Sequence, residues 1–229
     1  KTRLFLAELG VDLLLLLAFT LGGLLQWLDQ TLFALLGDRG HVHGIALFAG
    51  FAIAGFIVNL PFTLYRTFVL EARFGFNKMT PALFVADLAK STALAVVIGG
   101  PVLFAVLWLM AAMGDSWWFY VWLFWLGFNL LVMLLYPTFI APLFNKFTPL
   151  EDPTLKARIE ALLARCGFAA SGLFVMDGSR RSAHGNAYFT GFGKARRIVF
   201  FDTLLEKLTP AEVEAVLAHE LGHFKRRHI

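Results

Sequence analysis

The stretch STALAVVIGGPVLFAVLWLMAAMG, from Ser91 to Gly114, contains no formally charged side chain. Crossing the ~30 Å hydrocarbon core of a bilayer takes ~20 apolar helical residues, so this stretch is long enough to span a membrane. The chain of 229 residues is 59% hydrophobic and has a mean hydropathy of +0.71, well above the values of an ordinary soluble domain. The sequence therefore predicts a protein embedded in a lipid bilayer.

Three more stretches also lack formal charges: Leu13–Leu28, Gly44–Tyr65 and Ser116–Asn145. We expect transmembrane helices at about residues 5–28, 44–65, 91–114 and 117–136, within a transmembrane domain of residues 1–140. Glu8 and Asp12 fall in the opening turns of the first helix. Carboxylates inside a membrane normally face a bundle interior or a water-filled cavity. A helix that starts at the membrane interface explains these two residues equally well.

Basic residues are distributed unevenly between the connections of these helices. The connection between the second and third spans carries Arg66, Arg73, Lys78 and Lys90. By the positive-inside rule, this connection, the N-terminus and everything after about Tyr136 are expected on the cytoplasmic side. The net charge of +4 comes mostly from the last third of the chain, near the predicted membrane surface. Anionic lipid headgroups explain that charge better than nucleic acid does, so the bilayer is an expected partner and nucleic acid is not.

After the fourth span, charged and apolar residues are mixed, which predicts a cytoplasmic α+β domain over residues 141–229. We expect an amphipathic helix at Leu155–Cys166 and a short strand at Leu173–Met176. Asn186–Phe192 and Arg197–Phe201 lie around Gly191, Gly193 and Lys194 and predict a β-hairpin. The predicted fold class is mainly α: a polytopic helical membrane protein with a small α+β domain that contains a β-hairpin.

The last helix has a clear start signal. Thr209 is a suitable N-cap, Pro210 suits the first helical position, and Glu212 lies three residues after the cap. We expect this helix to continue through at least His228.

His219, Glu220 and His223 on this helix form an H-E-x-x-H motif. Histidines four residues apart project from one helix face and can bind a single metal ion. Zn²⁺ in a catalytic site is held by three protein ligands and lowers the pKa of a bound water toward ~7. Glu220 is the candidate base that takes the proton from this water, which predicts a zinc metalloendopeptidase. The competing interpretation is a pair of histidines with a purely structural role.

The third zinc ligand is not identifiable in the sequence. A two-histidine motif of this kind needs another His or Glu from a later element, and only Phe224–Ile229 follow. The chain also starts at Lys1 and stops within a helical pattern, so we expect it to be an internal fragment. The remaining histidines have no recognisable partner and are interpreted as non-ligands: His41, His43, His184 and His228.

The chain also resembles a known family well beyond the zinc motif. Four segments are similar, in the same order, to segments of the type I CAAX prenyl proteases: FGFNK (Phe74–Lys78), IAPLFNK (Ile140–Lys146), NAYFTGFG (Asn186–Gly193) and RIVFFDTL (Arg197–Leu204). Members of this family are integral-membrane zinc metallopeptidases of eukaryotes and, as homologues, of many bacteria. We expect a bacterial homologue.

The resemblance implies an α-helical membrane barrel around a large chamber, closed on the cytoplasmic side by the zinc domain. It implies one Zn²⁺ per chain, cleavage of C-terminal tripeptides from prenylated proteins, and a third zinc ligand that is a glutamate beyond this chain. Asn186, Ala187 and Tyr188 match the family segment that holds the substrate backbone, which suits an edge strand that pairs with an extended peptide. The alternative is that Asn186 only starts the hairpin.

Two other functions remain open from the sequence. An HtpX-type membrane-protein quality-control peptidase shares the zinc motif but has fewer spans before it. A non-catalytic membrane scaffold would use the histidines only for packing. The substrate is a peptide or protein, prenylated or not. The expected location is the inner membrane of a bacterium, or the endoplasmic reticulum of a eukaryote.

Overall fold

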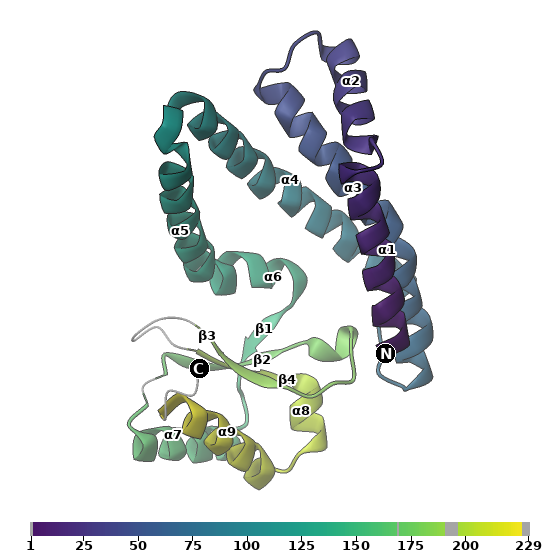
Figure 1. Cartoon of the computed structure of the whole chain (residues 1–229). Helices are drawn as coiled ribbons and strands as arrows, with labels where there is room; N and C mark the ends of the chain where they lie inside the picture. Colours follow the sequence, from purple (N-terminus) through teal and green to yellow (C-terminus); the bar gives the residue numbers. More distant parts are fainter. Residues whose placement is uncertain (1, 169, 191–196, 226–229) are drawn as a thin grey trace. The chain divides into compact units, whose positions relative to one another are not determined.

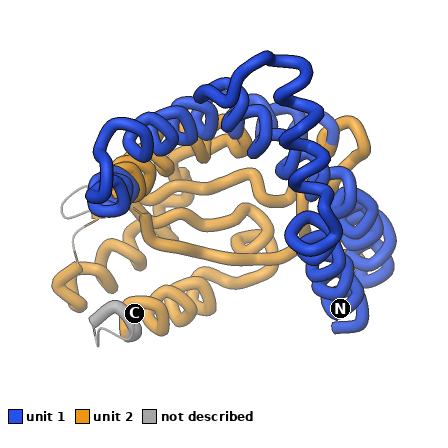
Figure 2. Tube along the Cα trace, turned by 45° about the horizontal axis from the view of Figure 1, so that its top comes forward, with its two compact units in different colours: residues 1–74, 85–126 blue, residues 75–84, 127–229 orange. Residues whose placement is uncertain are grey.

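The computed structural model of the chain describes residues 2–168, 170–190 and 197–225. The chain forms two compact units, which Figure 2 shows in different colours. Unit 1 comprises residues 1–74 and 85–126, and unit 2 comprises residues 75–84 and 127–229.

Long apolar helices make up the first part of the chain (Figure 1). They are α1 (Thr2–Thr20), α2 (Leu24–Leu36), α3 (His41–Tyr65), α4 (Pro81–Ala112) and α5 (Trp117–Leu135), with π-helical turns at Arg66–Glu71 and Tyr136–Ile140. Three continuous helical stretches are long and apolar enough to cross a membrane: His41–Glu71, Pro81–Ala112 and Gly114–Phe144, with mean hydropathies of 2.1, 2.4 and 1.9. The protein is therefore an integral, multi-pass membrane protein of mainly α fold.

The first expected span, residues 5–28, is not one straight helix. α1 ends at Thr20 and α2 begins at Leu24, and the two helices are bent by 56° at this break. Gly23 has a φ of 78°, in the left-handed region that glycine adopts without steric penalty. The uncharged sequence continues through the break, so hydropathy alone does not reveal the bend. Together the two helices form a fourth candidate span.

The third expected span is longer than predicted. α4 begins at Pro81, whereas the uncharged stretch begins at Ser91. Proline is tolerated in the first turn of a helix because its missing N–H has no intrahelical acceptor there. Thr80 Oγ1 accepts a hydrogen bond from the Leu83 N–H at 3.2 Å and caps this end. The uncharged stretch therefore marks the apolar part of α4, whereas the helix itself begins ten residues earlier.

The two carboxylates of α1 both contact α3 and its extension within unit 1. Glu8 forms an ion pair with Arg66, and Asp12 accepts a hydrogen bond from Asn59 Nδ2 at 2.8 Å. Each acidic group in this apolar helix therefore has a polar partner, which lowers the cost of placing it there. This arrangement agrees with carboxylates that face other helices.

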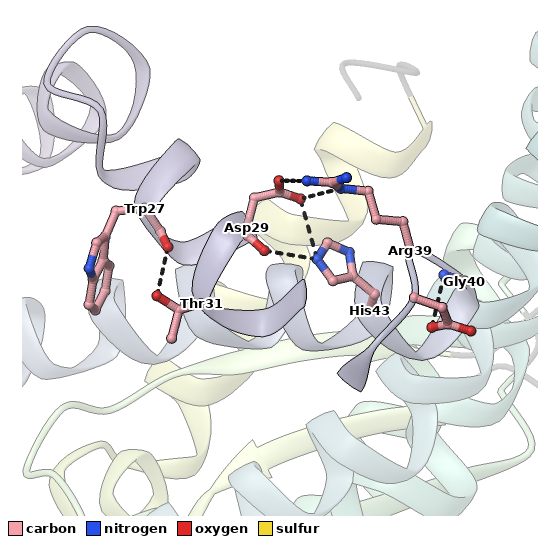
Figure 3. A network of polar contacts seen from close by, with 7 residues as sticks. Trp27, Asp29, Thr31, Arg39, Gly40 and His43 are labelled. Carbon is pink, nitrogen blue, oxygen red and sulfur yellow. Dashed lines mark hydrogen bonds and ion pairs between the residues drawn. The ribbon is translucent and has the colours of Figure 1, made fainter. Parts of the chain in front are cut away.

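A polar network joins α2 to the start of α3 (Figure 3). Arg39 Nη2 donates to Asp29 Oδ2 at 2.8 Å, while His43 Nε2 lies 3.3 Å from Asp29 Oδ1 and 3.2 Å from the Asp29 carbonyl oxygen. The His43 side chain is 4% exposed. A buried imidazole needs a hydrogen-bonding partner, and Asp29 supplies it. His43 therefore has a structural role in the α2–α3 turn.

Unit 2 contains a four-stranded sheet with the strand order β1-β2-β4-β3 among the described residues. Its strands are β1 (Phe147–Pro149), β2 (Gly172–Met176), β3 (Ala187–Thr190) and β4 (Arg197–Phe201). β3 and β4 pair antiparallel, as the predicted hairpin requires, and residues 191–196 between them lie outside the described part. β2 and β4 pair in parallel, a contact that the sequence pattern did not indicate. β3 is an edge strand.

Three helices cover one face of this sheet: α7 (Pro153–Cys166), α8 (Asp202–Lys207) and α9 (Pro210–Lys225). In Figure 1, α7 and α9 run beside each other below the sheet. Ile198 and Phe200 of β4 and Ile159 of α7 are fully buried in the core between these layers. α7 ends at Cys166 as predicted, where Gly167 has a φ of 65°, but it begins at Pro153 instead of Leu155 because Asp152 caps its N-terminus.

Candidate active site

The N-terminus of α9 is fixed by a hydrogen-bonded cap. The Glu212 carboxylate accepts from both the backbone N–H and the hydroxyl group of Thr209, each at 2.8 Å. This is one half of a capping box, in which the residue at the third helical position bonds back to the cap. The predicted start at Pro210 is therefore confirmed.

These two hydrogen bonds hold the pKa of Glu212 below its ordinary value of 4.5, the backbone N–H of Thr209 being the larger cause. Because the folded pKa is lower than the unfolded one, the ionised form stabilises the folded state above the ordinary pKa. That stabilisation is lost as the pH falls through the folded pKa. We expect Glu212→Gln to lower the melting temperature near neutral pH, with a difference from wild type that shrinks on acidification to about pH 3. Glu206→Gln, an exposed glutamate of α8, is the control.

A constant difference between wild type and Glu212→Gln across this pH range would contradict the assigned role of the carboxylate. Differential scanning calorimetry or intrinsic fluorescence in detergent provides the melting temperatures.

One face of α9 packs on the core through residues spaced four apart and at most 3% exposed: Val213, Leu217 and Leu221. At ~100° per residue, the positions of His219 and His223 lie roughly 140° from the centre of this buried face, one turn apart. The side chains of His219 and Glu220 are exposed. The backbone of His223 belongs to α9, and its side chain lies outside the described part. The helix thus places the positions of the two histidines away from the core, whereas Glu220 is exposed roughly 60° from the centre of the buried face.

The donors on this face are chemically suited to zinc, which binds imidazole nitrogens and carboxylate oxygens. Within the described residues, no three His, Cys, Asp or Glu side chains form a group that could hold a metal ion. His219 and Glu220 are nevertheless exposed rather than buried in the core. His219 fits a metal ligand that would be joined by His223 and a further residue, and Glu220 fits a base beside that metal.

The open edge of the sheet is formed by β3. The Phe201 N–H donates to the Asn186 carbonyl oxygen at 2.9 Å, and Tyr188 pairs with Val199. In an antiparallel pair, backbone groups alternate between pointing at the partner strand and pointing away from it. The N–H and C=O groups of Ala187 and Phe189 therefore point away from β4, to the open edge. An extended peptide can pair with such an edge.

Asn186 occupies part of this edge with its own side chain. Its Oδ1 atom accepts a hydrogen bond from the Ala187 N–H at 2.9 Å. The donor that an added strand would use is therefore already paired, which also protects the edge from unspecific pairing. The sequence placed Asn186, Ala187 and Tyr188 together on one element, and the structure has them at the start of the edge strand.

Tyr188 projects from the opposite sheet face to Phe189, which packs against the core near Phe168. The Tyr188 ring contacts the Phe201 ring edge-on, and the Tyr188 hydroxyl group lies 3.9 Å from Met176 Sδ. Burial, and to a lesser extent the neighbouring Tyr136, raises the pKa of Tyr188. Tyr188 is thus a neutral hydrogen-bonding group at physiological pH.

A junction around Arg181 connects three segments of unit 2 that are far apart in sequence. Arg181 donates to Asn145 Oδ1 at 3.0 Å and to the Phe144 carbonyl oxygen at 2.6 Å. Its own carbonyl oxygen accepts from the Lys78 N–H at 3.1 Å. The FGFNK and IAPLFNK segments thus both attach to the loop that precedes β3. From the sequence, Arg181 is one of the basic residues expected near lipid headgroups, and these contacts could not be predicted because its partners are distant along the chain.

The histidines interpreted as non-ligands have other contacts where the structure describes them. His43 pairs with Asp29, and the ring of His184 stacks on that of Phe76 at 4.1 Å. His41 lies against Phe104 with ring centres 5.4 Å apart. His228 lies outside the described residues.

Comparison with known protein families assigns both parts of the chain. Residues 1–146 match the family described as CAAX prenyl protease N-terminal, five membrane helices, and residues 149–229 match peptidase family M48. The chain belongs to the CAAX prenyl protease family. Members of peptidase family M48 are metallopeptidases, so the family implies a metal ion.

Curated relatives agree with this family assignment. The chain is 45% identical to CAAX prenyl protease 1 homolog of Arabidopsis thaliana, over 82% of this chain and 44% of that protein. It is 48% identical to CAAX prenyl protease 1 of Saccharomyces cerevisiae, over 76% of this chain and 38% of that protein. The chain therefore spans less than half the length of these relatives.

A solved structure of the family has the same fold. The crystal structure of S. mikatae Ste24p matches with a TM-score of 0.85 and 40% sequence identity, over 95% of this chain and 52% of that one. The mainly α membrane fold with a small sheet in the peptidase part is thus confirmed.

Proposed function

We propose that the protein is a membrane-embedded zinc metalloendopeptidase that hydrolyses peptide bonds near the C-terminus of prenylated CAAX proteins or of other membrane-associated proteins. His219 and His223 are the zinc ligands in this proposal, and Glu220 is the catalytic base. The third ligand is a glutamate outside these 229 residues.

One observation carries the proposal. α9 is continuous through the motif, and it buries Leu217 and Leu221 while His219 and Glu220 remain exposed. A purely structural histidine pair is expected to point into packed surroundings, since it gains nothing from exposure. An exposed metal-binding side chain at His219 beside the exposed carboxylate of Glu220 is the arrangement that a catalytic site requires.

Zinc held by His219 and His223 would supply a water of lowered pKa and a positive charge near the scissile carbonyl. The Glu220 carboxylate is placed to take up a proton from a water at this site and to return it to the departing amine. The open edge of β3 holds the substrate: the backbone groups of Ala187 and Phe189 pair with an extended peptide, after Asn186 releases the Ala187 N–H. Tyr188 orients this strand by packing on Phe201.

The proposed organisation is a transmembrane domain over residues 1–140 and a peptidase domain over residues 141–229. Basic residues support a cytoplasmic location of the peptidase domain: Arg66, Arg73 and Lys78 lie between α3 and α4, and Lys90 lies in the first part of α4. The bilayer surrounds the first domain, and the substrates reach the second from the membrane surface.

The test uses the full-length protein purified in detergent, with bound zinc measured by atomic emission and cleavage of a farnesylated CAAX peptide measured by mass spectrometry. We expect about one zinc per chain and release of a C-terminal tripeptide. Removing the metal with a chelator should abolish cleavage, and adding zinc should restore it. Cleavage that survives complete removal of zinc, or a protein that binds no zinc, would refute the proposal.

A further inference from the structure

A cavity of about 90 Å³ lies on the sheet face that carries Tyr188, within unit 2. Tyr188 and Thr190 of β3 line it together with Arg197 and Val199 of β4 and Phe174 of β2. Residues of the segment from Tyr136 to Pro142, at the end of the last membrane helix, line it as well. Of these lining residues, the catalytic proposal above uses only Tyr188.

The cavity reaches the edge strand, because two of its lining residues belong to β3. Side chains of an added strand alternate between the two faces of the sheet. A peptide residue that lies opposite Tyr188 therefore places its side chain on the face of the cavity, about 5 Å from the Tyr188 Cβ atom. The cavity is thus positioned to receive a side chain of a peptide that is bound at the open edge.

The size of the cavity limits what it can hold. A space for one water corresponds to about 10–15 Å³ in this measure, so 90 Å³ accommodates roughly six to nine water-sized groups. One aliphatic side chain fits, whereas a farnesyl chain is several times too long. Phe174 and Val199 give the wall an apolar surface, on which such a side chain loses its contact with water.

Arg197 adds a charge to this wall. Its guanidinium carbon lies 5.5 Å from the centre of the Phe174 ring, and the side chain is half-buried. Among the described residues, no carboxylate forms an ion pair with Arg197. A lysine or arginine side chain entering the cavity would meet a like charge in a partly desolvated place, which is unfavourable.

We propose that this cavity is a specificity pocket for one side chain of the bound peptide, selecting leucine, isoleucine or methionine and rejecting lysine and arginine. This inference rests on the proposed peptidase function, and in particular on binding of the peptide at the edge of β3. Thr190, Val199 and Arg197 determine the selection: the first two set the depth, and the third excludes positive charge.

The test measures equilibrium binding of fluorescent peptides to the full-length protein carrying Glu220→Gln, together with kcat/KM of the protein that retains Glu220. Each position on both sides of the cleaved bond is varied among alanine, leucine, phenylalanine and lysine. We expect one position at which leucine exceeds alanine by at least about ten-fold in both measurements, since a single methylene in an apolar pocket is worth about that much.

Two variants that change the volume of the pocket in opposite directions test its depth. Thr190→Phe fills it and should reverse the order of leucine and alanine at that position. Val199→Ala enlarges it and should raise phenylalanine relative to leucine. Arg197→Glu should improve the lysine peptide about ten-fold relative to leucine, whereas Arg165→Glu, on α7 outside the cavity, should not. Melting temperatures identify any variant that fails to fold.

A preference that is flat at every position, or unchanged in all three cavity variants, overturns the proposal. If these variants instead change only the amount of phospholipid that copurifies, the cavity is a lipid site and the proposal is wrong. Failure of every peptide to bind overturns it as well. Peptide binding with the expected preferences but without zinc-dependent cleavage would refute the proposed function and leave the pocket in place.

Discussion

The full-length protein carrying Glu220→Gln should retain its zinc and lose peptide cleavage by about 10²–10⁴-fold, the usual contribution of a general base. Glutamine has nearly the shape of glutamate and is not a strong base. Glu220 is exposed on α9 and does not belong to its buried face, which includes Leu217 and Leu221. The substitution should therefore leave the helix and its packing unchanged, and the loss should appear in kcat.

His223→Ala is the matched comparison on the same helix. It removes a proposed ligand, so zinc and cleavage should be lost together, whereas Glu220→Gln should separate them. Zinc content per chain, kcat and the melting temperature of both variants provide the measurement. Equal cleavage by wild type and Glu220→Gln would remove Glu220 from the mechanism, and full zinc content in His223→Ala would remove His223 from the metal site.

Those parts of the fold that depend on local sequence were predictable. Uncharged stretches identified the membrane helices, the end of α7 at Cys166 was predicted, and Thr209 with Glu212 marks the start of α9. The bend at Gly23 was not predicted, because the apolar sequence is uninterrupted there. The parallel pairing of β2 with β4 was not predicted either, since it joins strands separated by the hairpin partner β3 and depends on the packing of α7 and α9 against the sheet.

The candidate site shows the same division. His219, Glu220 and His223 follow from a spacing of four residues on a helix, which is a local property. The position of Arg197 in the wall of the cavity could not be predicted from the sequence, because its partner Phe174 lies on another strand. Arg181 has its acceptors at Phe144 and Asn145, which are similarly remote. Residues that act through contacts between distant segments become visible only once the chain is folded.

The edge strand provides the second large effect, through a pair of proline substitutions at adjacent positions. The Ala187 N–H points to the open edge of the sheet, and its bond is to the side chain of Asn186. Proline is accepted in an edge strand where the missing N–H faces away from the neighbouring strand. Ala187→Pro should therefore keep the fold and the zinc. It removes a donor for the substrate backbone and adds a ring at the edge, so kcat/KM should fall by about ten-fold or more.

Tyr188→Pro is the control with the opposite expectation. Tyr188 pairs with Val199, and its N–H points at β4, so proline there removes a bond of the sheet itself. We expect destabilisation by ~3 kcal/mol, the order of cost of proline where the N–H is needed, and a clear fall in the melting temperature. Peptide cleavage and thermal unfolding of both variants decide the matter. If Ala187→Pro cleaves as well as wild type, substrates do not pair with β3. If the two proline variants lower the melting temperature equally, then the assignment is wrong that the Ala187 N–H points to the open edge and the Tyr188 N–H points at β4.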